Sequence, residues 1–249
     1  MKVEWDYTDL ADAYLKRPEY AQKAIDQMVA QAGLKEQAVV CDIGAGAAHL
    51  TIMLARKGYT IYAVEPNDAM RSNGIKRTAE FEKVSWYDGV GEATGMPEKY
   101  FDLVTFGSSF NVCDRMQALA ESARILKDNG WFACMWNHRD LNDPLQEKIE
   151  AIIKAHIPEY NYGTRREDQT AIIDQSGLFK QVVKIEGNVI FDLPVQDFID
   201  GWKSHGTLQR QSKALFEKVV QEIGEAVYQV GTETVKVPYT TKIWMAQKK

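Results

Sequence analysis

Short apolar runs alternate with amphipathic stretches between Ala38 and Asn137. The runs are rich in residues that favour extended backbone, and they predict strands over 39–43, 60–64, 84–87, 101–106 and 131–136. The stretches between them carry apolar residues at helical spacing and predict helices over 47–57, 68–76 and 115–126. A chain that alternates strand and helix in this way builds a parallel sheet with right-handed crossovers and helices on both faces.

The pattern changes after Asn137. Longer amphipathic stretches predict helices over 144–156, 165–176, 194–202 and 212–223, and two late apolar stretches predict strands over 181–191 and 235–246. These strands would complete a seven-stranded, doubly wound (Rossmann-like) α/β sheet, mostly parallel, with the last strand antiparallel. We expect a single domain over 1–249, with its core at about 30–140 and 178–249. Helical lid elements are then expected at about 1–30, 140–176 and 195–230.

Composition narrows the choice of partners. The chain has 249 residues and a formal net charge of −5, which makes it a poor general binder of phosphate backbones, so we expect no nucleic-acid partner. Its three cysteines are far apart and no cluster has metal-ligand spacing, which predicts no metal and a reducing compartment. The first residues lack an apolar signal core, and no segment reaches transmembrane length. We therefore expect a cytoplasmic protein without a membrane partner, as a monomer or homodimer.

The stretch after the first predicted strand carries the strongest chemical signal. The strand contains Asp42 near its end and runs into Gly44-Ala45-Gly46, a turn that lets a ligand approach the backbone closely. A dinucleotide fingerprint would place a third glycine where His49 stands, and an acid at the strand end disfavours a pyrophosphate. Asp42 suits a cofactor with an ammonium group and no phosphate, such as S-adenosylmethionine. Glu65, after the second strand, could accept the ribose hydroxyls of either cofactor.

Several segments, in order, resemble the motifs of class I S-adenosylmethionine-dependent methyltransferases: 42–46, 65–70, 91–97, 100–104 and 121–130. The stretches 14–20 and 136–140 resemble the branch that includes trans-aconitate methyltransferase-like small-molecule enzymes, with a methyltransferase type 11 domain. The resemblance covers most of 10–140. It implies methyl transfer from S-adenosyl-L-methionine to an oxygen, nitrogen or carbon of a small-molecule acceptor, leaving S-adenosyl-L-homocysteine.

The resemblance also implies a set of cofactor contacts. Asp42 would lie near the methionine ammonium, Glu65 would hold the ribose hydroxyls, and Glu92 would accept from the adenine amine. Tyr14 and Arg17 would reach the cofactor carboxylate or close the entrance. The full set is Tyr14, Arg17, Asp42, Gly44, Ala45, Gly46, Glu65, Pro66, Asn67, Met70, Glu92, Ala93 and Ser108.

The acceptor side is less specified. Because a sulfonium is already a good leaving group, the protein mainly supplies orientation, exclusion of water and, in some cases, a base. His138 is the best-placed candidate base, although a structural role is the simpler interpretation. Arg165-Arg166 could bind an acidic substrate, but the acids that follow favour a solvated helix start. Candidate substrate contacts are Ser109, Asn111, Asn137, Arg139 and His205.

Two other functions stay open at this point. An NAD-type oxidoreductase would use the same glycine turn, although His49 and Asp42 count against it. A protein that binds S-adenosyl ligands without catalysis would share every cofactor contact and differ only in its acceptor site.

Overall fold

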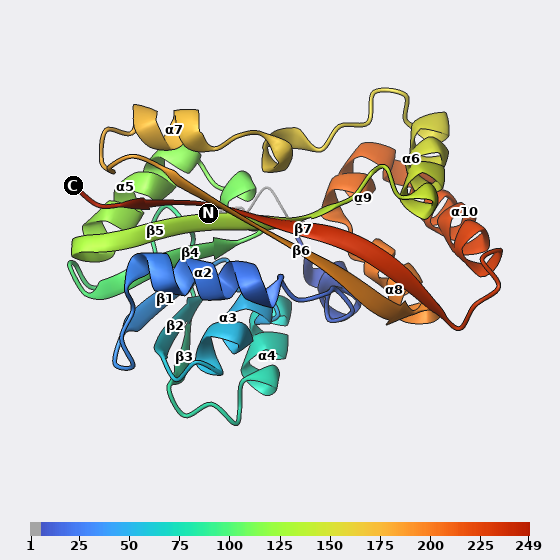
Figure 1. Ribbon diagram of the computed structural model, residues 1–249. Helices are drawn as coiled ribbons and strands as arrows, with labels where there is room; N and C mark the ends of the chain where they lie inside the picture. Colours follow the sequence, from blue (N-terminus) through green and yellow to red (C-terminus); the bar gives the residue numbers. More distant parts are fainter. Residues whose placement is uncertain (1–5) are drawn as a thin grey trace.

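A seven-stranded sheet with strand order β3-β2-β1-β4-β5-β7-β6 forms the centre of the computed structural model, which describes residues 6–249 (Figure 1). Strands β1 to β5 pair in parallel, and β7 pairs antiparallel with both β5 and β6. This confirms the predicted doubly wound, mostly parallel sheet with an antiparallel last strand. The strands are β1 Val39–Ile43, β2 Thr60–Val64, β3 Val84–Tyr87, β4 Phe101–Gly107, β5 Leu126–Arg139, β6 Val183–Pro194 and β7 Thr234–Gln247.

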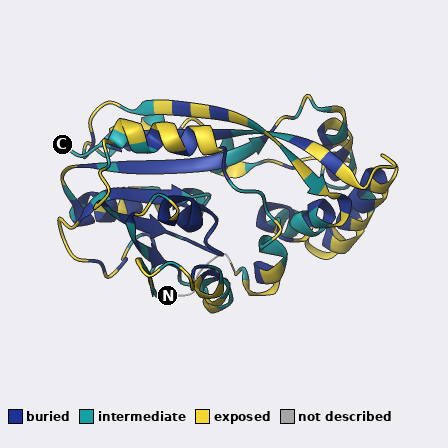
Figure 2. Ribbon diagram, turned by 60° about the horizontal axis from the view of Figure 1, so that its bottom comes forward, coloured by how far each residue is buried: buried dark blue, intermediate teal, exposed yellow. Residues whose placement is uncertain are grey.

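Helices cover both faces of the sheet because each presents an apolar stripe to it. Helices α2 and α3 pack on one face through residues such as Ile25 and Leu54, and α5 and α7 pack on the other through Leu119 and Ile173. The central strands β1 and β4 are accordingly mostly buried, whereas β6 at the edge of the sheet is largely exposed (Figure 2). In this first half the helices are η1 Thr8–Leu10, α1 Ala11–Tyr14, α2 Gln22–Ala32, α3 His49–Ala55, α4 Asp68–Arg77, η2 Phe110–Val112 and α5 Arg115–Ile125.

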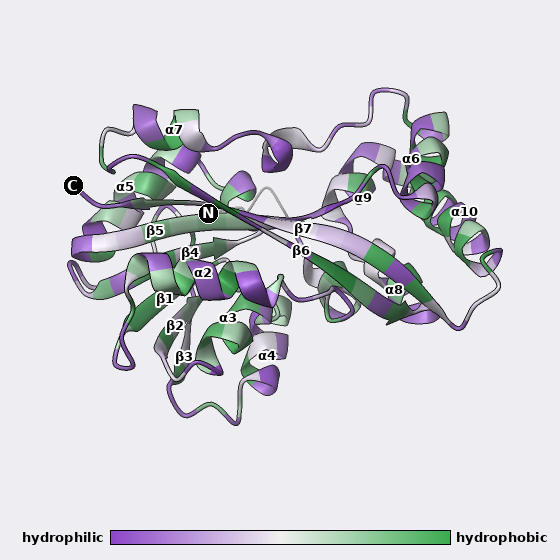
Figure 3. Ribbon diagram, viewed as in Figure 1, coloured by the Kyte–Doolittle hydropathy of each residue, from purple (hydrophilic) through white to green (hydrophobic). Residues whose placement is uncertain are grey.

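A second apolar core lies beyond the end of the sheet, where β6 and β7 run on as a long two-stranded ribbon (Figure 3). Helices α6, α8 and α10 pack around this ribbon, and we call the assembly the cap (ribbon residues 190–194 and 234–238 with helices α6, α8, α9 and α10). The remaining helices are α6 Pro144–His156, η3 Gly163–Arg166, α7 Thr170–Gln175, α8 Val195–Lys203, α9 Gly206–Ser212, η4 Lys213–Leu215 and α10 Phe216–Tyr228. Only part of the predicted lid 140–176 joins the cap, since α7 packs on the main sheet.

Local chemistry explains where several elements begin. Asn67 caps α4, because its side chain accepts from the backbone N–H of Met70 at 3.0 Å. Asp143 caps α6, and Pro144 occupies the first helical position, where no N–H is needed. Strand β5 starts at Leu126 rather than at the predicted residue 131, and its pairing with β4 is interrupted by a bulge between these two positions. No helix within residues 6–249 is long and apolar enough to span a bilayer.

Candidate active site

The glycine turn lies at the carboxyl end of β1, between β2 and β4. Gly44 and Gly46 have positive φ angles of 64° and 55°. A Cβ at Gly44 would lie 2.4 Å from Cβ of Ser109, so only glycine fits there. The N–H groups of Gly44 and Ala45 donate to the Val64 carbonyl at 2.8 and 3.1 Å, which holds the turn against the end of β2.

Two buried carboxylates flank this turn, and both receive hydrogen bonds from neutral groups. Asp42, 1% exposed, accepts from the hydroxyls of Thr51 at 2.6 Å and Thr105 at 2.9 Å. Glu65, 7% exposed, accepts from the backbone N–H groups of Gly46 and Asn67, both at 2.9 Å. Burial raises the pKa of Asp42 to about 6 and also raises the pKa of Glu65. None of these contacts comes from an ammonium or guanidinium group. The negative charge beside the turn is therefore not paired with a cation by these contacts.

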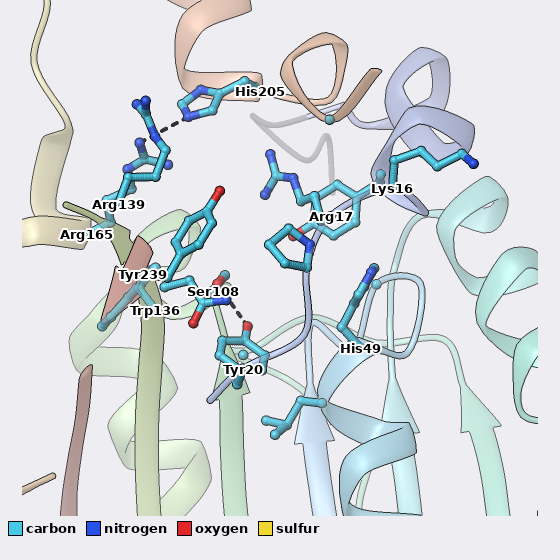
Figure 4. Close-up of a pocket in the computed structure, with 18 of the residues that line it drawn as sticks. Lys16, Arg17, Tyr20, His49, Ser108, Trp136, Arg139, Arg165, His205 and Tyr239 are labelled. Carbon is cyan, nitrogen blue, oxygen red and sulfur yellow. Dashed lines mark hydrogen bonds between the residues drawn. The ribbon is translucent and has the colours of Figure 1, made fainter. Parts of the chain in front are cut away.

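A cavity extends from the glycine turn to the cap (Figure 4). The structure brings most of the predicted site into its walls. From the predicted cofactor set these are Tyr14, Arg17, Asp42, Gly44, Ala45, Gly46 and Ser108. From the predicted acceptor set they are Asn111, Asn137, His138, Arg139 and His205.

Other predicted residues lie outside this cavity, on the far side of the turn. Ser109, a predicted substrate contact, does not face the cavity. Its hydroxyl donates to the Ile43 carbonyl at 2.6 Å and the residue is 6% exposed, so it braces the turn. Asn67 caps α4, and Glu92 accepts from the N–H of Asp114 at 2.6 Å. The predicted contacts that do not line the cavity are Glu65, Pro66, Asn67, Met70, Glu92, Ala93 and Ser109.

Residues 14–20, which we call the N-terminal segment, close the cavity on one side. Arg17 stacks over Tyr14, with 4.0 Å between its guanidinium carbon and the ring centre, and it donates to the hydroxyl and the carbonyl of Ser204 at 2.8 and 2.7 Å. The Tyr20 and Ser108 hydroxyls lie 2.9 Å apart, and burial raises the pKa of Tyr20. These contacts join the N-terminal segment both to β4 and to the end of α8.

Two predicted acceptor residues have structural hydrogen bonds. Nε2 of His138 lies 3.0 Å from the Arg165 carbonyl, which can only accept, so the proton is on Nε2 and Nδ1 is left as the acceptor. Burial lowers the pKa of His138 to about 4, so the ring is neutral at pH 7. The Asn137 amide donates to the Glu19 carbonyl at 2.8 Å and accepts from Thr241 at 2.6 Å. His138 thus holds η3 to β5, and Asn137 holds the N-terminal segment.

Part of the chain is similar in sequence to known proteins. Residues 41–134 match the family model described as a methyltransferase domain. This stretch, about two fifths of the chain, is similar to a methyltransferase domain. An uncharacterized methyltransferase of Schizosaccharomyces pombe is 30% identical over 148 residues, which are 59% of this chain and 58% of that protein. The chain therefore spans little more than half the length of this curated relative.

Solved structures share the fold of this chain. YcgJ of Bacillus subtilis superposes with a TM-score of 0.59 at 19% identity, over 91% of this chain and 98% of that one. Phosphoethanolamine N-methyltransferase 2 of Haemonchus contortus, in complex with phosphomonomethylethanolamine and S-adenosylhomocysteine, gives 0.53 at 13% identity, over 91% and 52%. The predicted resemblance to class I S-adenosylmethionine-dependent methyltransferases is confirmed. The finer assignment to the trans-aconitate-like branch stays a prediction.

The cavity wall also contains two residues whose setting the sequence predicts wrongly. Arg165 and Arg166 do not start a solvated helix; they end the short turn η3, are half-buried and line the cavity. The acids expected to accompany them turn away, since Glu167 pairs with Arg115 at 3.5 Å and Asp168 pairs with Lys184. The tyrosine-rich stretch just before the two arginines was the available signal, because guanidinium groups stack on aromatic rings.

Proposed function

We propose that this protein transfers a methyl group from S-adenosylmethionine to a small-molecule acceptor held between the glycine turn and the cap. The observation that carries the proposal is the pairing of a glycine turn with two buried acids, Asp42 and Glu65, that have only neutral hydrogen-bond donors. Such a site attracts a cationic ligand with exchangeable hydroxyl and ammonium hydrogens and repels a pyrophosphate. The methyltransferase-domain match over 41–134 supports the same function.

The residues present fit this cofactor. Gly44 and Gly46 line the cavity without side chains, which lets a ligand approach their backbone closely. Each oxygen of the Glu65 carboxylate accepts one hydrogen bond in the structure, so each keeps a lone pair for a ribose hydroxyl. Arg17, on the opposite side of the cavity from the cap arginines, is positioned to hold the cofactor carboxylate (Figure 4). When bound, S-adenosylmethionine supplies an electrophilic methyl group on a sulfonium.

The protein's own contribution is orientation and exclusion of water. The aromatic rings of Tyr20, Trp136 and Tyr239 line the cavity between the turn and the cap and form an apolar wall around the acceptor. Two histidines of the cavity wall are weak bases, because burial lowers the pKa of His138 to about 4 and the pKa of His205 well below its usual value. We infer that neither histidine acts as a general base and that the acceptor atom is nucleophilic at pH 7 without them.

The two other functions considered from sequence are less well supported. An NAD-type oxidoreductase needs a phosphate-tolerant turn, whereas His49 occupies the third glycine position and is 7% exposed, packed against Tyr14 with 5.7 Å between ring centres. A non-catalytic binder of S-adenosyl ligands would have no use for an enclosed polar cavity beyond the cofactor site.

Calorimetry with S-adenosylhomocysteine, followed by a methyl-transfer assay with radiolabelled S-adenosylmethionine, tests the proposal. We expect saturable binding at one site per chain. Glu65→Gln should weaken it by about tenfold or more, because one charged acceptor becomes a mixed donor and acceptor. Glu186→Gln, an exposed acid paired with Lys242, is the matched control and should bind as the parent protein does. Absence of binding in the parent protein would contradict the proposed function.

A further inference from the structure

The cap side of the cavity carries a group of arginines that the cofactor does not account for. Arg139 is the last residue of β5, and Arg165 and Arg166 end η3. Figure 4 shows Arg139 and Arg165 together beside His205, on the wall opposite Arg17 and His49. We call Arg139, Arg165 and Arg166 the cap arginines.

Arg139 has an unused hydrogen-bond donor inside the protein. It is 8% exposed, its Nη1 donates to Oε1 of Gln146 at 2.7 Å, and its guanidinium stacks 4.2 Å above the Trp202 ring centre. Its Nη2 is buried without any hydrogen-bond partner. Burying a charged donor without an acceptor costs free energy of folding. The unpaired Nη2 of Arg139 therefore indicates a position where a ligand supplies the missing acceptor.

The other two cap arginines also contact only neutral groups. Nη2 of Arg166 donates to the Arg139 carbonyl at 3.0 Å, and its guanidinium stacks 4.3 Å from the Tyr162 ring centre. Nη2 of Arg165 lies 3.2 Å from Nε2 of His205. A neutral imidazole accepts at only one of its two nitrogens, and Nδ1 of His205 already accepts from the Leu208 N–H at 3.3 Å, so Nε2 gives Arg165 no acceptor.

The nearby acids are engaged elsewhere. Asp197 lines the cavity but pairs with Lys16 at 2.8 Å. Glu150 accepts from the Tyr162 hydroxyl and pairs with Lys154 at 3.4 Å. Asp42 lies below the glycine turn, bound by two threonines. Within residues 6–249 no ion pair at or below 4.0 Å joins a cap arginine to a carboxylate.

Three guanidinium groups without counter-ions therefore converge on an enclosed cavity. Burial lowers the pKa of Arg165 to about 10, and its arginine neighbours act in the same direction. The group still carries its charge at pH 7, so the repulsion persists in the free protein. A planar anion with two acceptor oxygens would satisfy the fork of Arg139 and Arg165 and relieve that repulsion.

We propose that the methyl acceptor is a small anion whose carboxylate or phosphate group binds Arg139 and Arg165, with Arg166 adding positive charge behind them. This inference rests on the proposed methyl transfer, because it names the acceptor's class. Its anchoring group binds at the cap, which leaves the rest of the molecule to extend past Tyr239 and Trp136 toward the glycine turn.

The inference is tested with probe anions. Succinate, inorganic phosphate and the neutral succinamide are titrated by calorimetry into the full chain, free and saturated with S-adenosylhomocysteine. We expect both anions to bind and succinamide not to bind, and the tighter of the two anions identifies the anchoring group. Arg139→Gln with Arg165→Gln should weaken anion binding by at least about tenfold. Arg56→Gln removes one positive charge from an exposed arginine outside the cavity and should leave anion binding unchanged.

The outcomes separate the two proposals. Equal binding of succinate and succinamide, absence of anion binding, or full affinity in the double variant would overturn the anionic acceptor. If the double variant does not fold, the Arg139→Lys and Arg165→Lys pair keeps the charge but loses the planar fork, and it should bind anions more weakly than the parent protein. The S-adenosylhomocysteine titration reports on the proposed function alone, since its contacts lie on the opposite wall.

Discussion

The two sides of the cavity carry opposite charge and hold it in different surroundings. On the sheet side, Asp42 in the cavity wall and Glu65 beside the glycine turn lie at strand ends and accept hydrogen bonds from neutral donors. On the cap side, Arg139 ends β5 and Arg165 ends η3, and neither pairs with a carboxylate of the described residues. The acidic wall therefore suits a cationic methyl donor and the basic wall an anionic acceptor, so each excludes the other's ligand.

The largest expected effect breaks the sheet wall directly. Gly44→Val places a Cβ 2.4 Å from Cβ of Ser109 at a φ of 64°, so the turn must move. We expect a loss of several kcal/mol in the free energy of unfolding and no measurable S-adenosylhomocysteine binding. Gly33→Val is the control, because Gly33 has a φ of 63° but no atom within 4 Å of an added Cβ. Denaturant titration should show a loss of only about 1–2 kcal/mol there.

A second prediction uses the buried charge of the sheet wall. The pKa of Asp42 is about 6 in the folded protein against 3.8 unfolded, so the folded state binds the proton more tightly. Its ionisation costs stability as pH rises from about 4 to 6, by at most about 3 kcal/mol. Asp42→Asn should remove this pH dependence and raise the melting temperature at pH 7.5, while weakening S-adenosylhomocysteine binding. If the stability of Asp42→Asn changed between pH 4 and 7 as much as that of the parent protein does, Asp42 would not be the titrating group.

The smallest expected effect contrasts two arginines of the cavity. Arg17 donates two hydrogen bonds to Ser204, so Arg17→Gln should cost about 1–3 kcal/mol of stability. Arg165 faces other arginines without an acid, so Arg165→Gln should leave stability unchanged or raise it by up to about 1 kcal/mol. Thermal denaturation of both variants checks the contrast. Equal losses would mean that Arg165 contributes to folding rather than to ligand binding.

Elements that depend on local sequence pattern were predicted well from the sequence. The strands 60–64 and 84–87 and the helix 144–156 match the structure residue for residue, because their apolar periodicity is local. The glycine turn was recognisable for the same reason. Helix α9 was missed because it is a seven-residue segment whose start is set by the His205 side chain accepting from the N–H of Leu208.

The cap arginines could not be placed from sequence because their setting depends on distant partners. Arg165-Arg166 beside Glu167-Asp168 has the appearance of a solvated, self-neutralising segment. In the fold, Asp168 pairs with Lys184 of β6 and accepts from the indole of Trp244, which removes the local counter-ion. Arg139 was proposed as an acceptor contact from its place at a strand end, but its unpartnered nitrogen is visible only in three dimensions.

The long ribbon of β6 and β7 limits how ligands can enter and leave the cavity. Its two strands stay paired from Val183 with Met245 to Pro194 with Thr234, and they pass without interruption from the main sheet into the cap. A cap carried on continuous paired strands has no hinge on that side and cannot swing open like a lid. The N-terminal segment closes the cavity by side-chain hydrogen bonds instead, such as those of Arg17 with Ser204 and Tyr20 with Ser108. Reactants would then enter and leave by release of this segment, and the rate of that release would set an upper limit on turnover.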